Sequence, residues 1–182
     1  MTDFLLIIIT LVFMVTFILI VSKFSKNKSY NFDERQEIIR GRAFKYAYFS
    51  YLIYGIGYSA VSDLLEKDFM TTPTSFLVGM YISLIIFAVY NICNEAFFAF
   101  NQKPVSYILI FSITTLCSGF SGISAIIDGS IIENGVLTLD CIGVISSITF
   151  AIILIAMLLK MIINKKAEQE GWFKNKSAFY TF

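Results

Sequence analysis

Apolar segments long enough to cross a lipid bilayer constrain this chain more than any other feature of its sequence. The first covers residues 4–21 and is interrupted only by Thr10 and Thr16, whose hydroxyl groups can bond back to their own helix. A hydrocarbon core about 30 Å thick is crossed by roughly 20 helical residues. Because lipid offers no hydrogen-bond partner to an open backbone, a segment of this kind has to form a helix.

Five such segments predict an all-α fold, a polytopic bundle of about five transmembrane helices. The predicted spans cover residues 4–21, 44–62, 76–93, 105–127 and 141–159. Hydrophobic residues make up 57% of the 182-residue chain and charged residues only 15%, which is too apolar for an average soluble domain. The only prolines, Pro73 and Pro104, stand just before the third and fourth spans, where a helix tolerates a missing backbone donor.

These spans divide the chain into two regions. We expect residues 1–163 to form one membrane domain, with a cytoplasmic juxtamembrane segment at 22–43. The loop before the fifth span contains typical turn residues at 128–130 and 134–135, where the chain must reverse. Residues 164–182 form a basic, aromatic cytoplasmic tail suited to an anionic lipid surface, with a short disordered tail as the alternative.

Basic residues indicate the orientation of the spans. All but one of the 14 lysines and arginines follow the first, third or fifth span, and Lys67 is the exception. Because basic residues in short loops stay on the cytoplasmic side, we expect the N-terminus outside and the C-terminus inside a bacterial plasma membrane. The first span follows Asp3 instead of a basic residue, which favours an uncleaved anchor over the alternative, a cleaved signal peptide.

Residues that carry enzyme chemistry are scarce. The chain has no histidine, which removes the commonest general base and transition-metal ligand. Cys93, Cys117 and Cys141 lie in or beside apolar segments, where a thiol behaves as a small hydrophobic group. The stretch Gly119-Phe120-Ser121-Gly122 resembles the G-x-S-G pattern of rhomboid proteases, but a serine nucleophile needs a base to take its proton. We therefore expect no enzyme, catalytic residue, metal or cofactor.

Small residues at helical spacing predict close contacts between helices. In lipid, pairs of small residues four positions apart let two backbones approach each other. The candidate packing positions are Gly55 and Ser59 in the second span, and Ser118, Ser121, Gly122 and Ala125 in the fourth.

Three tyrosines lie along one face of the second predicted span. Tyr51, Tyr54 and Tyr58 are spaced by three and then four residues, which places them on one side of a helix. Their rings and hydroxyl groups could line a ligand cavity. Alternatively, they pack at a helix interface or in the aromatic belt at the membrane surface.

Polar residues gather near the inner end of the third span. These residues are Asn91, Asn94 and Glu95. Ionisable groups within a membrane often mark functional sites, and Glu95 is the candidate for burial because Asn91 shares its helical face. A solvated helix end is the alternative. A cavity that combined these residues with the tyrosines would suit a small transporter, channel or immunity-type protein.

The segment 31–45 is the most distinctive hydrophilic part of the chain. Asn31 can cap a helix here, with Glu34 as its capping-box partner, and acidic residues in the first turns suit the helix dipole. Basic residues follow where the helix meets anionic head groups. The segment is therefore either a capped membrane anchor or a docking surface for a cytoplasmic protein. The docking candidates are Asp33, Glu34, Arg35, Glu37 and Arg40.

The same segment resembles a group of small multi-span bacterial and archaeal membrane proteins of unknown function. The resemblance rests on Asp33-Glu34-Arg35-Gln36, on Ile38 or Ile39, and on the basic residues of 40–45, and it covers about 30 of the 182 residues. Such proteins are often encoded near small helix-turn-helix regulators, which implies a regulatory or accessory role at the membrane. The resemblance supplies no catalytic residues.

Together these patterns predict a non-enzymatic regulatory or accessory protein of the membrane. We expect it to contact the lipid bilayer and a cytoplasmic or membrane protein partner, to make no direct contact with nucleic acid, and to be able to form homo-oligomers. The alternative is a small transporter, channel or immunity-type membrane protein.

Overall fold

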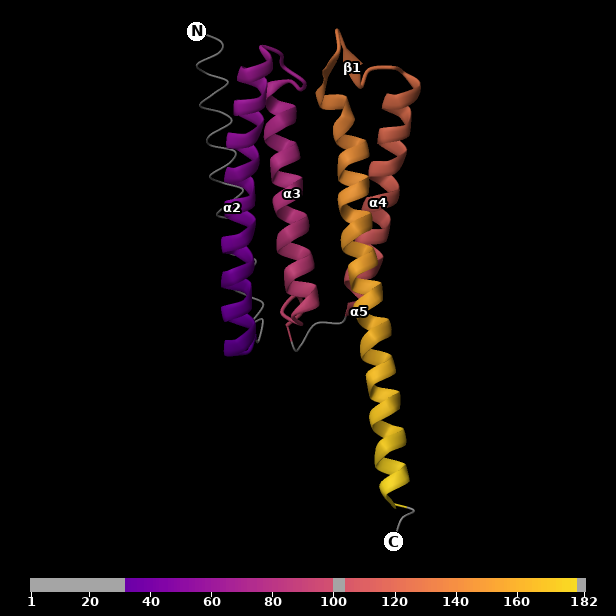
Figure 1. The fold of residues 1–182 in the computed structure, drawn as a ribbon. Coiled ribbons are helices and arrows are strands. Elements are labelled where there is room, and N and C mark those ends of the chain that lie inside the picture. The colour runs from indigo at the N-terminus through magenta and orange to yellow at the C-terminus, as the bar shows by residue number, and fades with distance from the viewer. Residues whose placement is uncertain (1–31, 100–103, 180–182) are drawn as a thin grey trace, which may run out of the picture. The chain divides into compact units, whose positions relative to one another are not determined.

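Four long helices make up most of the chain that the computed structural model describes, which is residues 32–99 and 104–179 (Figure 1). The helices are α2 (Glu34–Leu65), α3 (Thr72–Cys93), α4 (Pro104–Ile127) and α5 (Ile142–Phe179). Strands β1 (Ile132–Glu133) and β2 (Val136–Leu137) and the short 3-10 helix η1 (Leu139–Cys141) connect α4 to α5. The predicted first span, 4–21, lies outside the described residues.

Three helical segments are long and apolar enough to cross a membrane. They are Thr72–Cys93, Tyr107–Ile127 and Leu139–Lys166, and they coincide with the third, fourth and fifth predicted spans. The prediction of a helical membrane protein is confirmed at this level, but the count of five is not. The predicted span 44–62 lies within α2 and is helical, yet its many tyrosines, serines and glycines leave it outside this apolar group.

The helices pack in the order α2, α3, α5, α4. Successive helices along the chain run in opposite directions, so that α3 and α5 run parallel to each other (Figure 1). The core lies between α3 and α5 and contains Ala88, Ile92, Ile153 and Met157. Large apolar side chains elsewhere, such as Phe120, remain exposed, an arrangement that lipid tolerates because its tails are as apolar as leucine.

A small β-structure at one end of the described helices joins the loop between α2 and α3 to the connection between α4 and α5. Asn134 and Gly135 have φ values of 52° and 79°, which fit the Asn-Gly turn of a two-residue hairpin. The loop after α2 pairs with this hairpin, because the amide of Leu137 donates to the carbonyl of Phe69 at 2.9 Å and the amide of Thr71 donates to the carbonyl of Leu137 at 2.9 Å. We call this the hairpin end (66–71 with 128–141), and the opposite end the base end (32–45 with 91–98 and 160–166).

The first turn of α2 is capped differently from the prediction. Asp33 is the N-cap: its side chain accepts from the amide of Arg35 at 2.9 Å, and Gln36 closes the capping box by accepting from the amide of Asp33 at 3.4 Å. The predicted pair of Asn31 with Glu34 is therefore wrong by two positions, and Asn31 itself lies outside the described residues. Both pairs keep the spacing of three residues that a capping box requires, so spacing alone could not choose between them.

Candidate functional site

Gln36 attaches the start of α2 to the segment that follows α3. Its side-chain amide donates to the carbonyl oxygen of Glu95 at 2.8 Å and to that of Phe98 at 3.2 Å. Backbone carbonyl groups need hydrogen-bond partners, and this amide supplies partners for two carbonyls in the segment that follows α3. The first turn of α2 is therefore held in place by one side chain.

Glu95 connects three elements at the base end. Its φ of 61° lies in the left-handed region. The amide of Ala96 donates to Asn91 and the amide of Glu95 to Ile92, at 2.8 and 3.2 Å, which is the Schellman pattern that ends many helices. Glycine usually occupies the left-handed position of this pattern. Here the position carries a carboxylate, which pairs with Lys160 of α5 at 3.1 Å.

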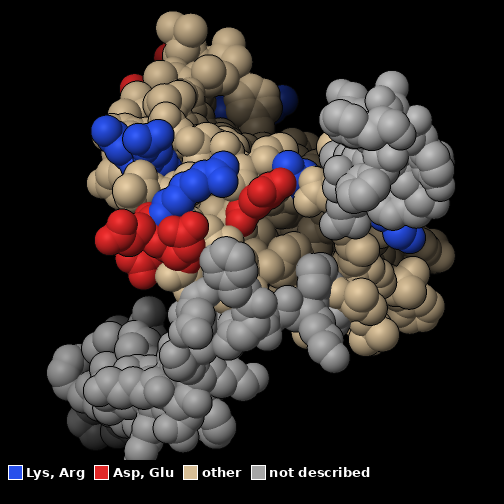
Figure 2. Space-filling model, turned by 90° about the horizontal axis from the view of Figure 1, so that it is seen from below, with Lys and Arg blue, Asp and Glu red and all other residues tan. Residues whose placement is uncertain are grey.

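The charged side chains around Gln36 point away from the helices that it contacts. Asp33, Glu34, Arg35 and Glu37 are all exposed, whereas Gln36 is partly buried. We call these four exposed residues the charged tip. Figure 2 shows acidic and basic side chains next to one another on the described surface at the base end. The fifth docking candidate, Arg40, is partly buried, and its guanidinium lies over the ring of Phe32, 4.1 Å from the centroid.

Asn91 and Asn94 bond mainly to their own helix. The Asn91 amide donates to the carbonyl of Phe87 at 2.8 Å, and the Asn94 amide donates to that of Tyr90 at 2.8 Å. Asn91 is almost fully buried, and its Oδ1 atom finds no hydrogen-bond donor among the described residues. This acceptor carries the desolvation cost of an unpaired polar atom.

No family model, curated protein or solved structure matches this chain. Its function therefore has to be inferred from the residues themselves. In the part of the chain that the structure describes, no three cysteine, aspartate or glutamate side chains are grouped so that they could hold a metal ion.

The predicted tyrosine face packs against α3 and the loop before it. The Tyr58 hydroxyl donates to the carbonyl of Met70 and accepts from its amide, both at 3.1 Å. The Tyr54 hydroxyl lies 3.9 Å from the sulfur of Met70, and Tyr51 packs edge-to-face on Phe76. These contacts place Tyr54 and Tyr58 towards the hairpin end, far along the helices from Glu95. The described residues thus do not bring the tyrosines and the polar group of Asn91, Asn94 and Glu95 into one cavity.

The predicted packing positions in α4 lie against α5. A Cβ atom at Gly122 would stand 2.7 Å from the backbone nitrogen of Val144, and one at Gly143 would stand 2.6 Å from the nitrogen of Gly122. Gly143 is absent from the predicted packing positions, although Ser147 stands four positions after it in the same predicted span. Ser118, Ser121 and Ala125 lie beside this contact and line a depression of about 760 Å³.

The predicted packing pair in α2 has a different environment. No atom of the described structure outside its own helix lies within 4 Å of a Cβ built at Gly55, so this glycine packs against no described helix. Ser59 is exposed and lines a polar depression at the hairpin end. The glycine that does permit close approach between α2 and α3 is Gly79, where a Cβ would stand 2.7 Å from the ring of Tyr54.

Sequence reasoning missed two residues of the base end, Gln36 and Lys160. In the sequence, Gln36 appears only as the last residue of the Asp33-Glu34-Arg35-Gln36 motif, and Lys160 is one of the basic residues that follow the fifth predicted span. A capping-box position three residues after Asp33 could have indicated Gln36. No local signal indicates that Lys160 meets Glu95, because the contact depends on how α3 and α5 are placed.

Proposed function

We propose that this chain is a non-enzymatic regulatory or accessory protein of a bacterial plasma membrane, and that its charged tip binds a cytoplasmic protein. The observation that carries the proposal is the attachment of Gln36 to the carbonyls of Glu95 and Phe98. It holds the first turn of α2 in place while the neighbouring charged side chains stay exposed. A preorganised surface binds a partner with less loss of conformational entropy.

The proposal includes five spans, with the base end in the cytoplasm. The first and second of these spans would be 4–21, which lies outside the described residues, and 44–62, the tyrosine-rich part of α2. Support for the orientation comes from the basic residues at the base end, and the positive-inside rule places such an end in the cytoplasm. Among the described basic side chains, those at the base end are Arg35, Arg40, Arg42, Lys45, Lys160, Lys165 and Lys166. Of the basic residues that the structure describes, Lys67 alone lies at the hairpin end.

The composition of the charged tip favours a protein partner over lipid. Three of its four residues, Asp33, Glu34 and Glu37, carry carboxylates. Anionic head groups attract basic segments, so the same head groups repel a surface with this excess of negative charge. A partner with a basic surface would complement the tip, and complementary charge speeds association and selects the partner.

Affinity capture from intact membranes tests the proposal. We expect the double variant Asp33→Ala, Glu34→Ala to lose partners that co-purify with the parent chain, while its level in the membrane stays unchanged. The matched control, Asp63→Ala with Glu66→Ala, removes the same charge at the other end of α2 and should keep those partners. Equal partner sets for the two double variants would refute the proposal.

A further inference from the structure

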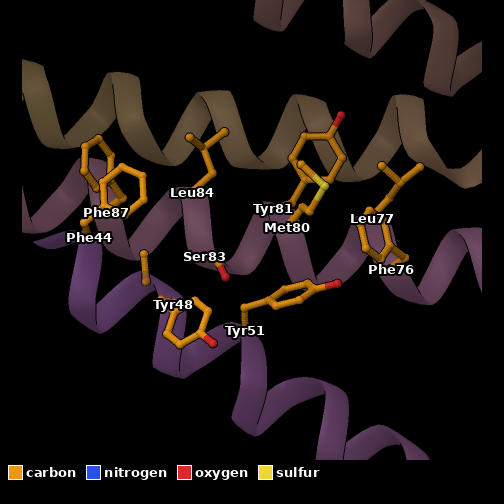
Figure 3. A pocket seen from close by; sticks show the side chains of 11 residues that line it. Phe44, Tyr48, Tyr51, Phe76, Leu77, Met80, Tyr81, Ser83, Leu84 and Phe87 are labelled. Atoms are coloured by element: carbon orange, nitrogen blue, oxygen red, sulfur yellow. The ribbon is translucent and has the colours of Figure 1, made fainter. Parts of the chain in front are cut away.

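An apolar groove with a cavity volume of about 640 Å³ runs between α2 and α3. Figure 3 shows the side chains that line it, with Tyr48 and Tyr51 extending from α2 beneath α3. Edge-to-face pairs of aromatic rings stand towards its two ends: Phe44 with Phe87 nearer the base end, and Tyr51 with Phe76 nearer the hairpin end. The groove is open to the surroundings, since Phe44 and Phe76 remain 69% and 55% exposed.

The dimensions of the groove suit a lipid tail. Its lining on α3 extends from Phe76 to Phe87, which at 1.5 Å per residue is about 16 Å. One leaflet of a hydrocarbon core about 30 Å thick is about 15 Å deep. The helix that forms this lining, Thr72–Cys93, is one of the three apolar enough to cross a membrane, so the groove lies where acyl chains are the surrounding solvent.

A basic residue that does not itself line the groove precedes its base end along α2. Arg40 precedes Phe44 by four residues in α2, so it lies one turn away on the same face of the helix. Its guanidinium is stacked on the ring of Phe32, and stacking leaves the N–H groups at the guanidinium edge free for a phosphate. Among the described residues, no carboxylate lies within ion-pair distance of Arg40.

We propose that the groove binds one acyl chain of an anionic phospholipid, with the lipid phosphate held by Arg40. The site is separate from the charged tip and does not depend on a cytoplasmic partner. A second protein helix fits the groove less well, because helices in lipid associate through small residues that let backbones approach. The groove is lined mostly by bulky side chains such as Phe44, Tyr48 and Tyr51. Ala47 and Ser83 are the only small residues in its lining.

Photo-crosslinking in lipid nanodiscs tests this site on the full chain. The discs contain phosphatidylcholine with a small fraction of phosphatidylglycerol whose acyl chain carries a diazirine. We expect crosslinks to concentrate in the peptides that contain 44–51 and 76–87. Ala47→Phe fills the groove from its α2 wall and should remove most of this labelling, while circular dichroism confirms that the variant keeps its helix content.

Two arginine variants test the phosphate contact. Arg40→Gln should lower the yield with the phosphatidylglycerol probe about fivefold, the factor that one basic residue contributes near an anionic surface. Arg42→Gln makes the same change two residues away, on the opposite face of α2, and should leave the yield unchanged. A phosphatidylcholine probe with the same diazirine should label both variants equally.

Three results would overturn the proposal. If the exposed face of α4, around Leu116 and Phe120, were crosslinked as strongly as the groove, the lipid would have no preference for the groove over any other apolar surface. An equal loss of crosslinking yield in Arg40→Gln and Arg42→Gln would show that Arg40 does not hold the lipid phosphate. A disulfide-linked dimer formed through Ala47→Cys, in a chain without its native cysteines, would show that a second copy fills the groove.

Discussion

At the scale of single residues, Glu95 combines a strained backbone with a long-range contact. A side chain in the left-handed region costs about 1 to 2 kcal/mol relative to the ordinary helical region, and glycine would avoid this cost. The ion pair with Lys160 offsets only part of it, because the two side chains are 53% and 26% exposed and exposed pairs contribute about 0 to 1 kcal/mol. Glu95 therefore adds one polar contact at the base end to a helix pair whose apolar core is Ala88, Ile92, Ile153 and Met157.

The close contact at Gly122 predicts that an added side chain there destabilises the fold. Gly122→Ala should lower the free energy of unfolding by about 1 to 3 kcal/mol, the usual cost of overpacking. The added Cβ would stand 2.7 Å from the backbone nitrogen of Val144, and the backbone yields less readily than a side chain does. Titration with sodium dodecyl sulfate, followed by circular dichroism, measures the change.

Gly55→Ala is the matched control for this substitution. A Cβ at Gly55 meets no atom within 4 Å, and alanine in a helix interior is favoured over glycine by about 0.5 to 1 kcal/mol. The control should therefore be as stable as the parent chain or slightly more so. If both variants lost the same stability, the close contact between α4 and α5 would be disproved.

At the scale of elements, the apolar helices were the most predictable part of the fold. The fourth span was predicted at 105–127 and α4 covers Pro104–Ile127, because a long apolar run between a proline and a turn leaves little choice of boundary. The pairing of the hairpin with the loop after α2 was not predictable. Asn134 and Gly135 indicate a local turn, but the bonds of Leu137 to Phe69 and Thr71 depend on where two separate loops meet.

The attachment of α2 at its first turn leads to the element-scale prediction. Gln36→Ala removes two hydrogen bonds across elements, each contributing about 0.5 to 1.5 kcal/mol. We expect the amides of residues 37–39 to exchange with deuterium faster, while exchange in the membrane-crossing part of α3 stays the same. Hydrogen exchange measured by mass spectrometry in detergent micelles gives both quantities.

Arg35→Ala is the control for the attachment, since Arg35 is exposed and its backbone amide, which Asp33 caps, is retained. It should leave exchange at residues 37–39 close to that of the parent chain. Unchanged exchange in Gln36→Ala would show that the first turn of α2 is stable without this side chain, and the argument for a preorganised charged tip would fail.

At the scale of the whole molecule, the orientation in the membrane is the testable consequence of the charge distribution. In a chain without native cysteines, Lys67→Cys should react with an impermeant maleimide applied to whole cells. Arg42→Cys should react only after the membrane is permeabilised, because basic residues near membrane helices are retained in the cytoplasm. Labelling of Arg42→Cys in intact cells would reverse the proposed orientation.

By itself, the sequence determined that the chain is helical and apolar enough for a membrane, because hydropathy and helix length are sums over neighbouring residues. It predicted five spans, of which the described structure supports three. It also indicated the hydrophilic segment that contains the charged tip. Only the tertiary structure decided that Gln36 and Lys160 meet Glu95 and that Gly122 meets Gly143. It also separated Tyr58 from Asn91. These contacts depend on the rotation and height of one helix against another, which no local pattern of residues specifies.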